Sequence, residues 1–301
     1  MEAWIPITIA AAFLQNLRSA LQRHIKGRLS TAGAAYARFV YAWPFALVYV
    51  WALNAIGGLA WPKPNATFLI YCVLGGFTQV LFTMLLLYLF QFRNFAVGTT
   101  FSKLETIIVA ALGALILGDG LGPVAALAVL VSAAGVMCLT MDEANLTLRA
   151  LIVNLGGKPT LIGLLCASCL GASVVFFRGG ALSLGHESVT MAAGYTFAVS
   201  VVIQTVIMGA WIHWREPGEI GRVLCHWRQA GLVGIAGALG SIAWFTAFTL
   251  QNAAYVRALG QIELVFTFLS SVLFFKERVG RWELLGILLV VGGILLILLA
   301  R

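Results

Sequence analysis

Residues Leu284–Leu299 read LLGILLVVGGILLILL, a run without a charged or hydrogen-bonding side chain. The run does not alternate between polar and apolar residues, as the strands of a membrane β-barrel do. In lipid, only helices and closed barrels satisfy their own backbone hydrogen bonds. The run therefore predicts a helix within a bilayer, whose apolar core takes about 20 helical residues to cross.

The whole chain shares this character. Of its 301 residues, 61% are hydrophobic and 10% are charged, with a mean hydropathy of +0.98. A soluble domain carries roughly 25% charged residues, so lipid is the expected solvent and the expected partner. The net charge of +8 comes from basic residues in short loops, without a Lys/Arg-rich domain. We therefore expect no nucleic-acid partner and interpret the loop charges as topology signals.

Hydropathy predicts ten membrane spans, separated by polar or turn-forming stretches. They are Trp4–Leu21, Ala32–Leu53, Phe68–Phe90, Ala96–Leu117, Pro123–Met141, Leu161–Leu182, Val189–Trp211, Gln229–Leu250, Ala253–Phe275 and Trp282–Leu299. Between the fifth and sixth spans, apolar residues recur at helical spacing among polar neighbours, which predicts an interfacial linker helix. These residues are Leu148, Leu151, Ile152 and Leu155.

The two halves of the chain are related. Phe90–Met141 aligns without gaps to Phe248–Leu299 at an offset of 263 − 105 = 158, which places Glu105 opposite Glu263. Intramembrane carboxylates are costly, so their shared register carries more weight than apolar matches do. An odd number of spans per repeat inverts the second copy, and transporters are often built this way.

We therefore predict an all-α membrane protein of ten transmembrane helices arranged as two inverted five-helix repeats. Residues 1–141 form the first repeat, 142–160 the interfacial linker and 161–301 the second repeat. In the positive-inside count, Arg178 and Arg257 are taken as loop charges on the less basic face. That count places both termini outside the cytoplasm.

Short motifs close each half of the chain. The sequence Phe275–Lys276–Glu277–Arg278, followed by Leu284–Leu285–Gly286 and Gly292–Gly293, resembles the hallmark that ends each repeat of the EamA family. That family belongs to the drug/metabolite transporter superfamily. Leu117–Gly118–Asp119, followed by Gly135, resembles the first-repeat counterpart, with Asp in place of the usual Glu.

This resemblance covers essentially the whole chain, and it implies a permease of small molecules. The family usually has a proline just after the acidic residue that matches Glu105 or Glu263. Thr106 and Leu264 stand there instead, so a proline kink is not implied at these sites.

Polar residues inside the predicted spans are the candidates for substrate binding. Gln15 and Arg18 share one face of the first span, and Arg38 lies within the second. We expect the substrate to contact Gln15, Arg18, Arg38, Gln79, Trp244 and Tyr255. Within the spans, Arg18, Arg38 and Lys103 outnumber the two glutamates, which favours a substrate carrying a carboxylate.

The repeat-related glutamates have two open interpretations. Glu105 and Glu263 either exchange coupling protons or stabilise a break in the helix backbone. Because Lys103 accompanies Glu105 whereas neutral Gln261 accompanies Glu263, we expect Glu105 to stay ionised. Glu263 is then the better candidate for reversible protonation.

The expected function is transport of a small organic metabolite, amino-acid-like, carboxylate-bearing or zwitterionic, by alternating access. The sequence contains no HExxH, P-loop or GxSxG motif, so we expect neither an enzyme nor a bound metal or cofactor. The alternatives are a non-transporting membrane scaffold or receptor and a membrane-embedded enzyme. The expected location is a bacterial inner (plasma) membrane, and both a monomer and a homodimer stay open.

Overall fold

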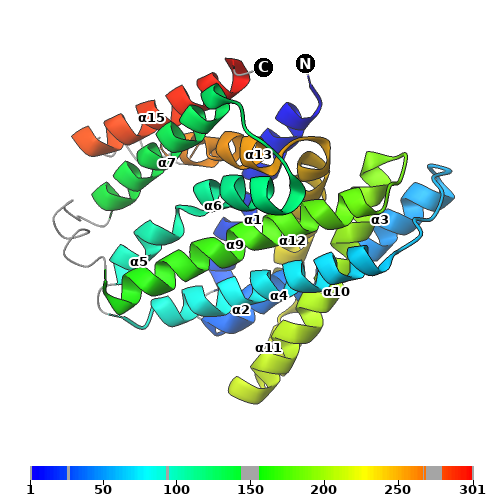
Figure 1. Ribbon diagram of the computed structural model, residues 1–301. Helices are drawn as coiled ribbons and strands as arrows, with labels where there is room; N and C mark the ends of the chain where they lie inside the picture. Colours follow the sequence, from blue (N-terminus) through cyan, green and yellow to red (C-terminus); the bar gives the residue numbers. More distant parts are fainter. Residues whose placement is uncertain are drawn as a thin grey trace. The chain divides into compact units, whose positions relative to one another are not determined.

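The computed structural model describes residues 2–25, 28–92, 95–143, 156–266, 268 and 280–299 (Figure 1). Within these ranges the protein is helical and has no strand. The helices are α1 (Trp4–Ile25), α2 (Thr31–Val40), α3 (Trp43–Ala55), α4 (Ala66–Leu89), α5 (Phe95–Ser102), α6 (Glu105–Leu112), the π-helical η1 (Gly113–Leu117), α7 (Pro123–Glu143), α9 (Lys158–Ser183), α10 (Val189–Arg215), α11 (Glu219–Cys225), α12 (Trp227–Leu250), α13 (Ala253–Gly260) and α15 (Arg281–Leu299).

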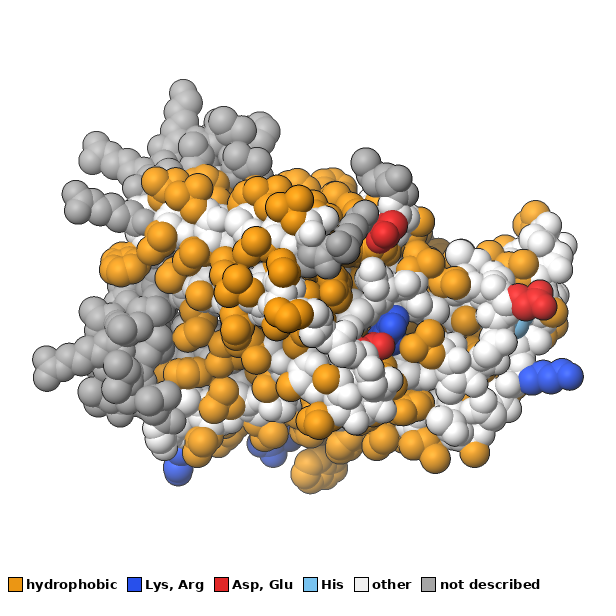
Figure 2. Space-filling model, turned by 45° about the horizontal axis from the view of Figure 1, so that its top comes forward, with side chains coloured by type: hydrophobic (Ala, Val, Ile, Leu, Met, Phe, Trp, Pro, Cys, Tyr) orange, Lys and Arg blue, Asp and Glu red, His pale blue; other side chains and the backbone are white. Residues whose placement is uncertain are grey.

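Seven stretches of the described residues are long and apolar enough to cross a membrane. They are Ala66–Leu89, Val97–Leu117, Pro123–Thr140, Lys158–Ser183, Val189–Arg215, Trp227–Leu250 and Trp282–Leu299. Large hydrophobic side chains point outward, such as Leu115 and Val206, and hydrophobic atoms cover much of the face in Figure 2. The described part of the chain is therefore all-helical, and its apolar helices are those of a multi-pass membrane protein. The count of ten spans and the inversion of the repeats stay predictions.

The described chain forms two compact units, each containing segments from both sequence halves. Residues 1–80 with 173–251 make unit 1, and residues 81–172 with 252–301 make unit 2. The two units are defined by contacts in space, whereas the predicted repeats 1–141 and 161–301 are consecutive stretches of sequence. The repeats therefore stay a prediction. The linker residues Leu148, Leu151, Ile152 and Leu155 lie outside the described residues, as does the motif Phe275–Arg278.

In unit 1, α1 packs along α12, and α10 packs against α2, α3 and α12. The predicted second span, Ala32–Leu53, is two helices here, because α2 ends at Val40 and α3 begins at Trp43. The physical reason is Pro44 in the first turn of α3. Proline lacks the N–H that a continuous helix needs and fits best in a first turn.

In unit 2, glycines let α7 and α15 pack with their backbones close together. A Cβ on Gly135 would lie 2.7 Å from the carbonyl oxygen of Gly286. A Cβ on Gly293 would lie 2.9 Å from the carbonyl oxygen of Ala128. Small residues at such crossings are the usual means of helix association in membranes, where lipid is as apolar as the side chains.

Helix ends in unit 2 repeat at the offset found in the sequence. Helix α5 starts at Phe95 and α13 at Ala253 (253 − 95 = 158), and they end at Ser102 and Gly260 (260 − 102 = 158). Helices α7 and α15 start at positions with the same offset (281 − 123 = 158). The predicted fourth span is therefore broken after Ser102, and Glu105 begins the next helix. The sequence register thus coincides with a repeated backbone break.

The glycine crossing leads to a direct test. Gly293→Ala is expected to lower the free energy of unfolding by about 1–3 kcal/mol, because the new methyl group would meet backbone atoms that cannot rotate away. Gly292→Ala is the matched control, because nothing lies within 4 Å of its Cβ position. Alanine there should stabilise the helix by up to about 1 kcal/mol. Unfolding in detergent measures both, and equal behaviour of the two variants contradicts the close crossing.

Candidate functional site

Two arginines lie close together inside unit 1. Arg18 is on α1 and Arg38 is on α2, and both flank Gly237 of α12. A Cβ on Gly237 would lie 3.5 Å from Arg18 Cδ and 3.8 Å from Arg38 Cβ, so the glycine leaves room for both stems. The two positive charges are near enough to interact unfavourably. The pair therefore forms a concentrated positive site.

Arg38 has a buried hydrogen-bond donor that the described residues do not satisfy. Its Nη2 atom is buried and has no hydrogen-bond partner among the described residues. Its guanidinium carbon lies 4.3 Å from the centroid of the Phe39 ring. A buried donor without a partner costs about 1–3 kcal/mol, and a charged donor costs more. An anion bound at this atom would remove that cost.

Gln15 and Trp244 complete the site in unit 1. Trp244 Nε1 donates to Gln15 Oε1 at 3.1 Å, which ties α12 to α1. The Trp244 ring stacks on Phe248 with 5.4 Å between the ring centroids. Gln15 and Arg18 are one helical turn apart on the same face of α1. The hydrogen bond between the Gln15 amide and the Trp244 indole therefore joins α1 to α12 next to the arginine pair.

The other two predicted substrate contacts are on other helices. Gln79, on α4 in unit 1, accepts a hydrogen bond from Ser173 Oγ at 3.2 Å, which links α4 to α9. Tyr255 is on α13 in unit 2. Of the six predicted residues, the structure thus gathers Gln15, Arg18, Arg38 and Trp244. The role of all six in substrate binding stays a prediction.

Glu105 has a partner that sequence reasoning missed. Its carboxylate forms an ion pair with Arg257 of α13, and the exposed fractions of the two side chains are 9% and 14%. The Lys103 side chain, which was expected to keep Glu105 ionised, is exposed instead. The treatment of Arg257 as a loop charge was wrong. The signal was present, because Arg257 lies inside the predicted span Ala253–Phe275.

Glu263 acts on the same arginine. It interacts electrostatically with Arg257, on the other side of the break that follows α13. Gln261 lies within that break, and its Nε2 donates to Thr106 Oγ1 at 3.2 Å. The two repeat-related breaks are therefore joined by a hydrogen bond, and both glutamates interact with one cation.

Arg178 was also counted as a loop charge, and this was wrong too. It is buried on α9 and donates to the carbonyl oxygens of Phe248 and Gln251, the latter at 2.7 Å. These carbonyls are at the C-terminal end of α12, where backbone acceptors lack helical partners. A positive charge there is also favoured by the helix dipole. Arg178 therefore stabilises a helix end.

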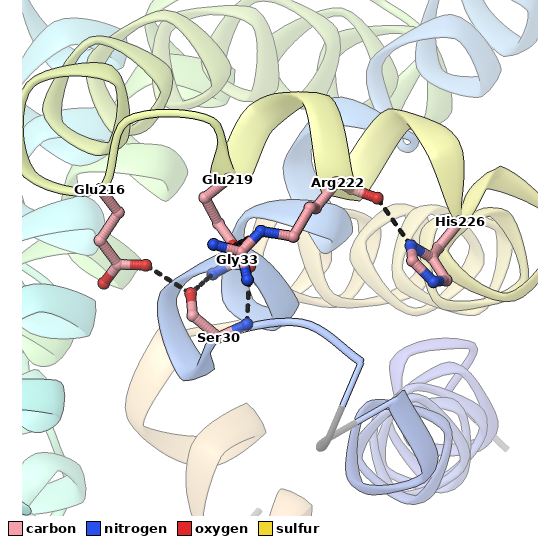
Figure 3. Close-up of polar contacts among 6 residues, drawn as sticks. All are labelled: Ser30, Gly33, Glu216, Glu219, Arg222 and His226. Atoms are coloured by element: carbon pink, nitrogen blue, oxygen red, sulfur yellow. Dashed lines mark hydrogen bonds and ion pairs between the residues drawn. The ribbon is translucent and has the colours of Figure 1, made fainter.

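A second polar cluster fixes the connection between α10 and α12 (Figure 3). The fully buried Glu219 accepts from the Ser30 backbone N–H at 2.6 Å and pairs with Arg222 at 3.0 Å. Ser30 Oγ donates to Glu216 at 2.5 Å and accepts from the Gly33 N–H at 2.9 Å, which caps α2. These contacts join the segment before α2 to the segment between α10 and α12, so we interpret the cluster as structural.

No group of three or more His, Cys, Asp or Glu side chains suited to a metal ion occurs in the described part of the chain.

Comparison with known proteins finds a match to one transporter family. Residues 158–299 match the model of the EamA-like transporter family. The chain is 29% identical over 135 residues to an uncharacterized transporter in the cobO 3' region of Sinorhizobium sp., covering 44% of this chain and 92% of that protein. These matches confirm the EamA resemblance, and they support the drug/metabolite transporter superfamily and membrane transport in general. Because EamA family members are transporters, the matches are also consistent with a chain that is not an enzyme.

A solved crystal structure is similar over 99% of this chain and 98% of its own, with a TM-score of 0.70 and 16% identity. At that identity, the likeness shows the fold alone.

Proposed function

We propose that this chain, whose residues 158–299 match the EamA-like transporter family, transports a small organic metabolite that carries a carboxylate. The observation that carries the proposal is the arginine pair, in which a buried Arg38 nitrogen has no partner among the described residues. The substrate is amino-acid-like, another carboxylate or a zwitterion. Transport proceeds by alternating access across a bacterial inner membrane.

The energetics of Arg38 favour an anionic ligand. An arginine at the centre of a span costs about 2.5–3.5 kcal/mol even on the most lenient scale. A carboxylate offsets this cost, because its two oxygens match the planar fork of the guanidinium. Arg18 adds a second positive charge, and Gln15 and Trp244 present polar groups on a neighbouring wall. If Arg38 had a purely structural role, we would expect its Nη2 to donate a hydrogen bond to another protein group.

The repeated helix breaks support the proposed mechanism. Helices α5 and α13 end at equivalent positions, which is what two copies of one five-helix unit would produce. In transporters with inverted repeats, one part rocks against another around a central substrate site. Ten helices in two inverted repeats belong to this proposal.

Uptake into vesicles separates this proposal from its alternatives. Purified protein in liposomes should accumulate or exchange radiolabelled amino acids or organic acids, above the level of empty liposomes. A scaffold, a receptor or a membrane-embedded enzyme gives no such flux. Absence of flux across a panel of amino acids, dicarboxylates and keto acids would count against transport of carboxylates.

Substitution of Arg38 tests the binding site. Arg38→Lys keeps the charge but loses the fork, and the affinity for carboxylates should fall about tenfold, the equivalent of one charge-assisted hydrogen bond of about 1.4 kcal/mol. Arg38→Ala should abolish stabilisation by carboxylates in a thermal-shift titration. Arg28→Lys is the control, because Arg28 is exposed and its Nη1 donates to Gln229 at 2.7 Å. Stronger stabilisation by amines than by carboxylates would refute the proposed ligand class.

A further inference from the structure

The exposed charges of unit 1 are distributed unequally between the two ends of α10. Helices α10 and α12 are both apolar enough to cross a membrane, so the segment that joins them lies at one membrane surface. On that segment and beside it, the structure exposes four arginines: Arg28, Arg215, Arg222 and Arg228. The other exposed charged residues in the described part of unit 1 are Glu2, Lys63 and Glu187, whose charges sum to +1 − 2 = −1.

These three residues lie at the opposite end of α10. The connection from α3 to α4, which contains Lys63, touches the connection from α9 to α10, which contains Glu187. The contact is a hydrogen bond from His186 Nε2 to the Ala60 carbonyl oxygen at 2.9 Å. Helix α1 runs antiparallel to α12, so Glu2 lies at this end as well. Unit 1 is therefore strongly basic at one end only.

The basic end is hidden in the sequence, where residues 213–228 contain three arginines and two glutamates. The structure separates the two signs of charge (Figure 3). Glu219 is fully buried and accepts from the Ser30 backbone N–H, and the half-buried Glu216 accepts from Ser30 Oγ. Arg222 pairs with Glu219 while 62% of its own side chain stays exposed. Both carboxylates are thus directed at the start of α2, and the outer surface carries the positive charges.

Two exposed tryptophans accompany the arginines. Trp214 is 77% exposed and Trp227 is 60% exposed. The Arg228 guanidinium carbon lies 5.6 Å from the centroid of the Trp227 ring, and Arg28 Nη1 donates to the neighbouring Gln229. Tryptophan is enriched at the level of the lipid headgroups, because its ring is apolar and its N–H is polar. We name Arg28, Arg215, Arg222, Arg228, Trp214 and Trp227 the basic edge.

We propose that the basic edge binds the phosphate groups of anionic phospholipids. Arginine suits a phosphate, because its planar fork can donate two parallel hydrogen bonds to the phosphate oxygens. Basic residues at the headgroup level are attracted to anionic lipids and gain little from zwitterionic ones. The tryptophans hold the same level of the bilayer, next to the arginines. The lipid site does not depend on the proposed transport function.

Titration of the full-length protein in mild detergent, followed by native mass spectrometry, tests the site. The probes are phosphatidylglycerol and phosphatidylcholine with identical acyl chains. The wild type should bind phosphatidylglycerol about tenfold more tightly or better, because two or more arginines contribute. Arg215→Gln and Arg228→Gln should each weaken phosphatidylglycerol about fivefold, the equivalent of about 1 kcal/mol for each charge, and leave phosphatidylcholine unchanged. Neither arginine takes part in the ion pair with Glu219.

Lys63→Gln is the matched control, because it removes an exposed cation from the other end of unit 1. It should leave the preference for phosphatidylglycerol intact. Equal binding of the two lipids by the wild type would overturn the proposal, as would an unchanged preference in the double variant Arg215→Gln, Arg228→Gln. Inorganic phosphate that displaces phosphatidylglycerol at equal concentration would also overturn it, since it would indicate a site for free phosphate. Monodisperse elution with an unchanged unfolding midpoint confirms that each variant is folded.

Discussion

Arg257→Ala is expected to lower the free energy of unfolding by about 3–5 kcal/mol, because removal of one partner leaves a buried charge uncompensated. The ion pair with Glu105 is nearly enclosed, with exposed side-chain fractions of 9% and 14%. An ion pair on the surface would instead contribute about 0–1 kcal/mol. Chemical unfolding in mild detergent, followed by tryptophan fluorescence, measures the change.

The double variant Arg257→Ala, Glu105→Gln tests whether the two residues stabilise the protein as a pair. It removes the charge that the single variant leaves unpaired, so it should recover more than half of the lost stability. Additive losses in the two single variants and the double variant would show that the two residues do not act as a pair.

Glu219→Ala is expected to cost about 1–3 kcal/mol, because it leaves the Ser30 N–H without its acceptor and removes a negative charge from the start of α2. Glu219 is completely buried, and its one ionic partner in the described structure, Arg222, is 62% exposed. Glu187→Ala is a control at an exposed position. The loss should appear as a lower unfolding midpoint in the same assay.

Gly33 makes this prediction sharper. A Cβ on Gly33 would lie 3.0 Å from Glu219 Cγ, so Gly33→Ala should also be destabilising. In the Glu219→Ala background the added methyl group finds space, so the double variant should lose less than the sum of the two. Strict additivity would mean that Glu219 does not occupy the space beside Gly33.

Hydropathy predicted where most helices lie, because lipid imposes length and apolarity on each span. The predicted start of α10 at Val189 and the end of α12 at Leu250 coincide with the structure. The break before Trp43 was readable from Pro44 but was not predicted. The break after Ser102 has no proline or glycine signal in the adjacent residues, and it became apparent only from the matching end of α13.

The candidate site was also predicted only in part. Polar spacing predicted that Gln15 and Arg18 share one helix face, and both residues lie on α1 in the structure. The partner of Glu105 was missed because Lys103, two residues away, does not face it, whereas Arg257 comes from a distant helix. Tertiary packing decides which charges meet, and sequence distance is a poor guide across 152 positions (257 − 105).

The ion pair between Arg257 and Glu105 bears on how such a chain could have arisen by duplication. An ancestral homodimer of the first half would carry two copies of Glu105 and of Thr99, without an arginine at either place. In a single chain each half can change alone, and the second half has Arg257 where the first has Thr99. The two halves are therefore not interchangeable at this position, and a dimer of residues 1–141 would lack the arginine that pairs with Glu105.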